Sequence, residues 1–158
     1  MLAAGLVTVL IAAWHLHFFF RDPNQIELYA DTNSVIATSI ARQTEALGSD
    51  ATLFFLGQPR MYYQGNENMA FLAPDATVFD IAQPWDATAE RPALTGITLF
   101  AFVPERQQDL AIVRGWFPGG AETTHLQENG DLLYVSYLVE PSQADPVTGE
   151  LRNAAASP

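Results

Sequence analysis

The sequence predicts a transmembrane helix at the amino terminus, followed by a small three-layer α/β domain. The sheet is expected to be mostly parallel, with an antiparallel hairpin at its edge. Sixteen of the first twenty residues are apolar, which suits a helix in lipid. Short apolar runs typical of buried strands then alternate with helical patterns. The expected parts are a transmembrane helix (1–21), an α/β domain (22–140) and a flexible tail (141–158).

The first twenty residues carry no charged side chain of fixed sign. The hydrocarbon core of a bilayer is about 30 Å thick and takes about 20 helical residues. Aromatic residues such as Trp14 and residues 18–20 suit its boundary, and Arg21 ends the run. A buried helix of a soluble protein is the open alternative. A cleaved signal peptide fits poorly, because no cation precedes the apolar run.

The first helix of the domain is predicted to begin at Asp31-Thr32 and to end at Gly48, since these residue types are typical helix start and stop signals. Residues 25–30 could extend it backwards. Its apolar stripe at helical spacing comprises Val35, Ile36, Ile40 and Leu47. The continuous apolar run over residues 51–56 is typical of a strand buried on both faces.

Helix and strand patterns continue to alternate in the middle of the chain. Residues 67–73 are predicted to form a short helix, and residues 77–81 a second strand. Residues 83–95 include two prolines and are expected to form a loop. The clearest strand covers residues 97–103.

The last elements are a helix and a hairpin. Pro104 suits the first position of a helix, so residues 104–117 are predicted to be helical. The Asn129-Gly130 pair lies between residues 121–127 and 131–139, and such a pair between strand-like runs is a strong hairpin signal.

The composition excludes several classes of function. Seven Arg and no Lys stand against 18 acidic residues, giving a formal net charge of −11. The chain therefore lacks the basic patch that nucleic-acid binding needs. The absence of Cys excludes disulfides, thiolate metal sites and cysteine nucleophiles.

One loop is a candidate binding site. Arg60, Tyr62 and Tyr63 follow the predicted strand 51–56, and α/β folds usually bind ligands at the carboxyl ends of strands. A guanidinium with two aromatic rings could hold a phosphate or a sugar by bidentate hydrogen bonding and stacking. The competing interpretation is that Arg60 ties loops together by binding carbonyl groups.

No familiar catalytic motif is present. Asp75 and Asp80 lie around a predicted short strand, where residues five apart point to opposite faces. Capping and turn roles are therefore favoured for both, and His125 is interpreted as a surface imidazole. We expect no catalytic residue, no metal site and no cofactor.

Several short sequence segments occur in an order that is known from a protein family. They are residues 18–23 (FFFRDP), Tyr29, 54–57 (FFLG), 59–63 (PRMYY), 71–74 (FLAP), 79–81 (FDI) and 116–120 (WFPGG). Their succession resembles the C-terminal end of bacterial family 39 membrane glycosyltransferases, relatives of the dolichyl-phosphate-mannose–protein mannosyltransferases. The resemblance covers residues 1 to about 140.

In those enzymes a final membrane helix leads into a small extracytoplasmic α/β domain, and the catalytic acidic residues lie in a loop near the first membrane helix. No part of this chain corresponds to that loop, so no catalytic residue carries over. The resemblance implies a single-pass protein with an extracytoplasmic domain, non-catalytic by itself, serving as an accessory or scaffold subunit. Its expected partners are the lipid bilayer and a larger membrane complex or glycosyltransferase. The alternative is a module that binds a carbohydrate or a lipid-phosphate head group.

Overall fold

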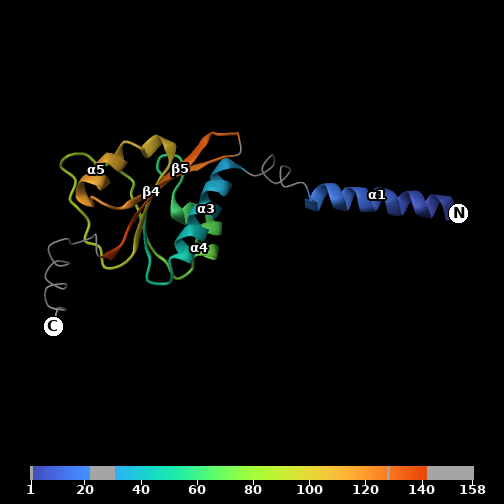
Figure 1. Ribbon diagram of the computed structural model, residues 1–158, viewed down its shortest axis with the longest axis horizontal. Coiled ribbons are helices and arrows are strands. Elements are labelled where there is room, and N and C mark those ends of the chain that lie inside the picture. The colour runs from blue at the N-terminus through green and yellow to red at the C-terminus, as the bar shows by residue number, and fades with distance from the viewer. Residues whose placement is uncertain (1, 22–30, 128, 142–158) are drawn as a thin grey trace. The chain divides into compact units, whose positions relative to one another are not determined.

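The computed structural model describes residues 2–21, 31–127 and 129–141, and within the first helix the side chains of residue 5 and residues 7–17. The chain divides into two compact units, residues 1–35 and 36–158. Figure 1 shows the ribbon, coloured from blue at the amino terminus to red at the carboxyl terminus. The predicted helix extension over residues 25–30 and the predicted tail beyond residue 141 lie outside the described residues.

In the first unit, α1 covers Leu2–Arg21 and confirms the predicted helix. Its described large apolar side chains are exposed, namely Val7, Val9, Leu10, Ile11, Trp14 and Leu16. The structure does not confirm the transmembrane character of this segment. Among the residues that are described, none of the helices combines the length and the apolarity that crossing a membrane requires.

Helix α3 (Thr32–Ala46) begins and ends close to the predicted signals. The Asp31 carboxylate accepts a hydrogen bond from the Ser34 N–H at 3.3 Å, as expected of a helix cap. Gly48 adopts a φ of 97° just beyond the last turn, a conformation that favours glycine. The buried face includes small residues that the apolar stripe did not predict; it comprises Ile36, Ala37, Ile40, Ala41 and Thr44.

Five strands form one mixed sheet in the order β2-β1-β3-β5-β4. They are β1 (Thr52–Leu56), β2 (Thr77–Asp80), β3 (Thr98–Phe102), β4 (Ala121–Leu126) and β5 (Leu132–Val139). All residues of β1 and β3 are buried, which confirms that residues 51–56 contain a strand covered on both faces and that residues 97–103 contain a strand. The hairpin β4–β5 lies at one edge, also as predicted.

The prediction that the sheet is mostly parallel is wrong. β1 pairs in parallel with β2 and β3, but β3–β5 and β5–β4 are antiparallel. The second strand of the hairpin, β5, lies beside β3, and β4 takes the edge. Polarity explains this order: β4 (AETTHL) is mostly exposed, whereas β5 (LLYVSYLV) is almost wholly buried, and polar strands are tolerated at sheet edges.

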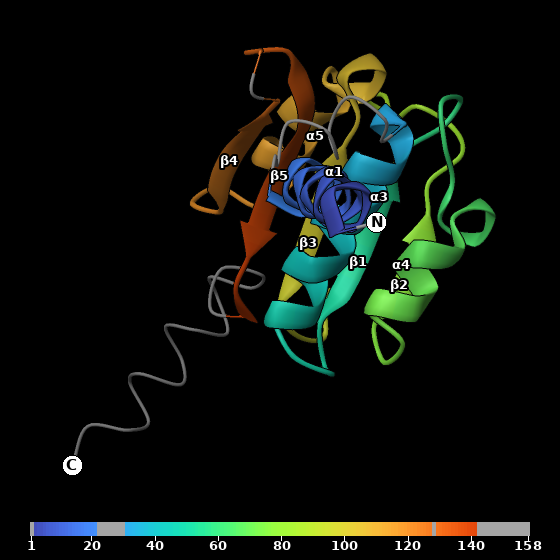
Figure 2. The same ribbon diagram turned by 90° about the vertical axis from the view of Figure 1, so that its right-hand side faces the viewer.

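Helices cover both faces of the sheet, which confirms the three layers (Figure 2). On one face, Ser39 Oγ of α3 lies 2.9 Å from the Tyr134 hydroxyl of β5. On the other face, Leu110 and Val113 of α5 (Asp109–Trp116) join a cluster of buried strand residues. Its strand members are Phe54, Leu56, Phe100, Phe102, Val135, Tyr137 and Val139. The short helix α4 (Glu67–Leu72) confirms the predicted helix before β2.

The segment after β3 differs from the prediction of one helix over residues 104–117. It forms a 3₁₀ turn, η2 (Pro104–Arg106), followed by α5. A second 3₁₀ turn, η1 (Tyr63–Gly65), lies between β1 and α4. The predicted loop over residues 83–95 contains no helix or strand.

Candidate functional site

The residues predicted to bind a ligand lie together on the chain segment that follows β1. Arg60 Nη1 lies 3.5 Å from Glu105 Oε1, so the guanidinium faces a carboxylate of this chain. Tyr62 is exposed, and its ring lies over Gly65, where a Cβ would come within 2.6 Å of a ring carbon. The segment therefore offers an aromatic surface, but Glu105 offsets the positive charge that an anionic head group would need.

Asp80 holds this segment against β2. The Tyr63 N–H donates to both carboxylate oxygens of Asp80, at 2.8 and 3.0 Å. Burial and, to a smaller extent, the charge of Asp80 raise the pKa of the Tyr63 phenol. Asp80 thus lies in β2 and binds the backbone amide at the start of η1, 17 residues earlier in the chain.

Arg106, which the sequence did not single out, ties the loops together. Its side chain is only 2% exposed and pairs with the fully buried Asp109, with Nε and Nη2 at 2.9 and 2.5 Å from Oδ2. The guanidinium also donates to backbone carbonyls in the loops after β1 and β2, those of Gln58, Ile81 and Gln83. Arg106 thus ties loops together by binding carbonyl groups, which is the kind of role that the sequence also suggested for Arg60.

The three residues considered for catalysis do not converge. Asp75 precedes β2 and Asp80 ends it, whereas His125 lies on β4 at the opposite edge of the sheet. Four strand spacings separate β2 from β4, which is about 19 Å. General acid–base partners must act within hydrogen-bond reach or through one water, so His125 cannot work with either carboxylate.

His125 and Ser136 form a close pair that resembles a catalytic dyad in distance only. His125 Nε2 lies 2.9 Å from Ser136 Oγ, and the imidazole stacks on the Tyr134 ring at 4.0 Å between centroids. Ser136 is 1% exposed and also accepts a hydrogen bond from Gln43 Nε2 at 3.2 Å. A substrate therefore has no access to the hydroxyl, and the pair joins α3 to the sheet.

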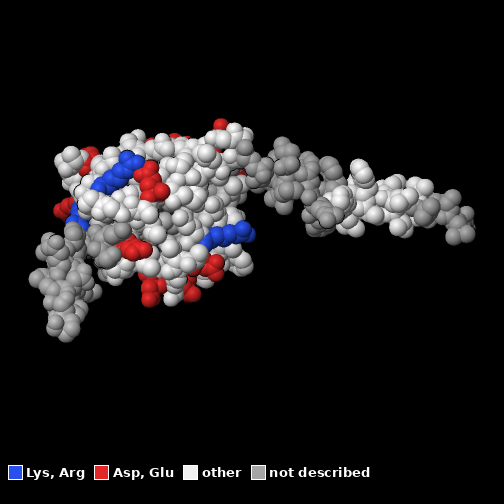
Figure 3. Space-filling model, viewed as in Figure 1, with Lys and Arg blue, Asp and Glu red and all other residues white. Residues whose placement is uncertain are grey.

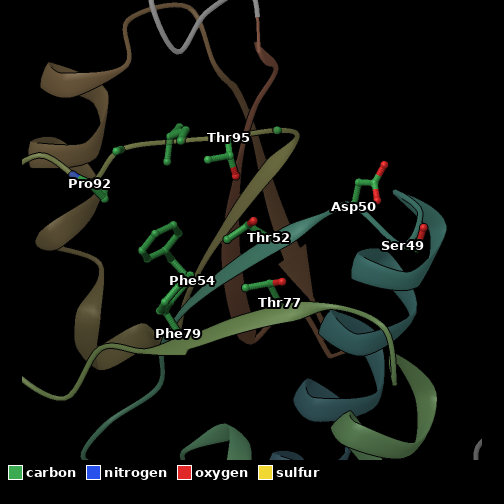
Figure 4. Close-up of a pocket in the computed structure, with 11 residues that line it drawn as sticks. Ser49, Asp50, Thr52, Phe54, Thr77, Phe79, Pro92 and Thr95 are labelled. Carbon is green, nitrogen blue, oxygen red and sulfur yellow. The ribbon is translucent and has the colours of Figure 1, made fainter.

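An open hollow of about 680 Å³ lies over β1 and β2 on the face that α5 partly covers. Its volume is within the range of about 300–1,000 Å³ usual for small-molecule sites. The floor is formed by Thr52, Phe54, Thr77 and Phe79, the roof by residues 92–96, and one end by Ser49 and Asp50. Figure 4 shows the two Phe rings next to each other, with Thr52 and Thr77 to one side and Thr95 above Thr52.

The floor results from a repeated tripeptide. Residues 52–54 (TLF), 77–79 (TVF) and 98–100 (TLF) occupy three adjacent parallel strands in the same register. Threonines consequently pair with threonines and phenylalanines with phenylalanines across the sheet. The Phe54 ring stacks on Phe79 and on Phe100, each at 5.0 Å between centroids. The third Phe is fully buried, so the row runs from the core to the open edge.

The repeated Thr-x-Phe pattern was the sequence signal that could have located this hollow. It occurs inside all three predicted parallel strands, but its meaning depends on their register, which local patterns do not give.

Among the described residues, no group of three or more His, Asp or Glu side chains is placed to hold a metal ion.

Comparison of the sequence with protein-family models found no match, and neither did comparisons with curated proteins and with solved structures.

Proposed function

We propose that this chain is a membrane-attached accessory domain, in which residues 1–21 form a single-pass anchor and the α/β domain is not catalytic by itself. The observation that carries this proposal is that the described large apolar side chains of α1 are exposed on all sides of the helix. A helix that is apolar all round belongs in a protein interior or in lipid rather than in water. The sequence of residues 1–20 as a whole, sixteen of them apolar, supports lipid.

The non-catalytic part of the proposal is supported by the positions of the polar groups. Asp80 binds the Tyr63 N–H, Asp109 is buried against Arg106, and His125 packs on Tyr134. Each of these groups has a structural partner within the chain. The resemblance of the sequence to the end of a membrane glycosyltransferase supports an extracytoplasmic position and a role beside a larger membrane complex.

Cell fractionation without detergent tests the attachment. The full chain is expected to sediment with membranes, and Leu10→Arg with Ile11→Arg should release it, because one Arg at a helix centre costs about 2.5–3.5 kcal/mol on insertion scales. Gln107→Arg with Gln108→Arg adds the same charge at exposed positions and should change nothing. A wild-type chain that stays soluble without detergent would refute the anchor.

Protease protection tests the side of the membrane. Protease added to intact spheroplasts should digest the α/β domain, whereas digestion only after lysis would place the domain in the cytoplasm. The accessory role is tested separately by the size of the complex in mild detergent. A complex larger than this chain supports the role, and a lone chain contradicts it.

The alternative function, head-group binding through Arg60, Tyr62 and Tyr63, draws support from the exposed Tyr62 ring beside the carboxyl end of β1. Calorimetry with a polyprenyl phosphate distinguishes it. Arg60→Ala should abolish binding, and Glu105→Gln should strengthen it by removing the competing carboxylate. Equal affinities in all three proteins would remove Arg60 from any such site.

A further inference from the structure

The hollow over β1 and β2 is built by contacts that fix its roof at both ends. Before the roof, the Arg91 guanidinium carbon lies 4.6 Å from the centre of the Phe117 ring. After it, Thr98 Oγ1 donates to the Gly96 carbonyl at 3.1 Å. The hollow is therefore pre-formed, as small-molecule sites usually are.

The floor of the hollow contains exposed aromatic surface. Phe79 is 48% exposed although it lies in a strand, and its ring is within 20° of parallel to the Phe54 ring. The stack holds the Phe79 ring in place from one side. An exposed aromatic side chain that is held in this way can pack against the C–H groups on one face of a pyranose sugar.

Polar groups surround these rings. Thr77 and Thr52 stand beside them in the same register, Thr95 reaches down from the roof, and Asp50 lines one end (Figure 4). Hydroxyl groups both donate and accept hydrogen bonds, and a carboxylate accepts them. Such a set of groups complements a ligand that is rich in hydroxyls.

Charge narrows the class of ligand further. Asp50 is the one charged residue among those that line the hollow, and the chain as a whole has a formal net charge of −11. Anionic ligands are disfavoured by this field. A neutral ligand with hydroxyls and an apolar face suits the aromatic rings, the polar side chains and the negative charge of this hollow.

We propose that this hollow binds a neutral saccharide, with one sugar ring stacked on Phe79 and hydrogen-bonded to Thr77, and a second ring hydrogen-bonded to Asp50. Asp50 precedes Thr52, the register partner of Thr77, by two residues, so about four residues, or about 13 Å, separate the levels of Asp50 and Phe79. This length favours a disaccharide over a single ring. The proposal does not depend on attachment to a membrane.

Saturation-transfer NMR on the full chain, in a detergent without a sugar head group, tests the proposal. The probes are glucose, mannose, galactose and N-acetylglucosamine, their disaccharides, and glucuronic acid as the anionic counterpart. At least one neutral sugar should bind, and the disaccharide should bind more tightly than its monosaccharide. Glucuronic acid should bind more weakly than glucose, and Asp50→Asn should reduce that difference.

Two variants locate the site. Phe79→Ala should weaken binding about tenfold, the loss expected on removing an aromatic stacking surface. Thr77→Val keeps the side-chain shape and should weaken it about fivefold by removing one neutral hydrogen bond. Phe71→Ala is the matched control, since Phe71 is 83% exposed on α4 outside the hollow; it should leave binding unchanged.

Three results would overturn the proposal. The first is the absence of saturation transfer from every neutral sugar at millimolar concentration. The second is binding that survives both Phe79→Ala and Thr77→Val but is lost in Arg60→Ala, which would move the site to the segment after β1. The third is concentration-dependent self-association that Phe79→Ala abolishes, which would show that a second copy of the chain covers this surface.

Discussion

A buried arginine at the carboxyl ends of the strands determines how the loops are held. Arg106 is paired with Asp109 and donates to three backbone carbonyls, so its desolvated charge is compensated by a carboxylate and by carbonyl acceptors fixed in the fold. Arg114 offers a contrast, because it pairs with Glu122 at the surface with its side chain 52% exposed. A buried ion pair that loses one partner leaves an uncompensated charge, whereas an exposed pair is screened by water.

Replacing Arg106 should therefore destabilise the domain far more than replacing Arg114. Arg106→Met is expected to cost about 3–5 kcal/mol of unfolding free energy, and Arg114→Met no more than about 1 kcal/mol. Urea unfolding of the full chain measures both. Adding Asp109→Leu to Arg106→Met should recover part of the loss, because no charge then remains buried. Equal losses of unfolding free energy in Arg106→Met and Arg114→Met would refute the conclusion that the buried Arg106 pair matters more to stability than the exposed Arg114 pair.

His125 makes stability depend on pH. Burial lowers the pKa of its imidazole, so the unfolded chain binds a proton at a higher pH than the folded domain does. Stability is then fully present above the unfolded pKa, near 6.5, and is lost as the pH falls from there towards the lowered pKa of the folded state. His125→Gln should flatten this part of a stability–pH curve. An NMR titration that places the pKa of His125 above 6.5 would contradict the prediction.

At the scale of elements, two glycines near the junction of α5 and the β4–β5 hairpin have different surroundings. Gly120 precedes β4, and a Cβ there would overlap the Tyr137 ring and come within 2.9 Å of the Leu138 carbonyl oxygen. The ring cannot easily move, because the Tyr137 hydroxyl donates to the Phe117 carbonyl at 2.7 Å. Gly115 in α5 has no such neighbour within 4 Å.

The same substitution should consequently have opposite effects at the two positions. Gly120→Ala is expected to destabilise the domain by about 1–3 kcal/mol through overpacking. Gly115→Ala should stabilise it by as much as about 1 kcal/mol, because alanine is the better helix former. Thermal unfolding of both variants measures the difference. A destabilised Gly115→Ala would mean that this part of α5 packs against something else.

Local patterns predicted most helices and strands because the signals for each of them lie close together in the sequence. Asp31 and Gly48 delimit α3, and the apolar run 51–56 gives β1, since caps and continuous burial are local properties. The order of β4 and β5 was not predictable in this way. It depends on which strand of the hairpin has two apolar faces to bury, and the local hairpin signal is the same in both arrangements.

The candidate site was less predictable than the fold. Arg60, Tyr62 and Tyr63 were chosen by their place after a strand, and the structure keeps them there, with Arg60 paired to Glu105. Arg106 was missed because charged residues are almost always exposed unless paired, and the carbonyl groups that it binds come from loops more than twenty residues away. The aromatic floor was missed because it exists only through the register of three strands.

At the scale of the whole molecule, acidity is the dominant electrostatic property. Figure 3 shows acidic side chains spread over the visible face of the domain, with few basic ones among them. Among the residues that the structure describes, Arg60, Arg106 and Arg114 pair with carboxylates. Because 18 acidic residues outnumber seven arginines in the sequence, the acidic groups repel one another, which disfavours the compact state and any polyanionic partner.

Salt should stabilise this protein. Raising the ionic strength from about 0.01 to 0.15 M shortens the screening length from about 30 to 8 Å, which weakens repulsion among the acidic groups. The melting temperature at pH 7 should then rise by about 2–4 °C for each kcal/mol of repulsion removed. Glu45→Gln, Asp75→Asn and Glu90→Gln neutralise three exposed acids, so the triple variant should melt higher than the wild type at low salt and respond less to added sodium chloride. A melting temperature that falls with salt in the wild type would show that attractive ion pairs, and not the net charge of −11, dominate the electrostatics of the fold.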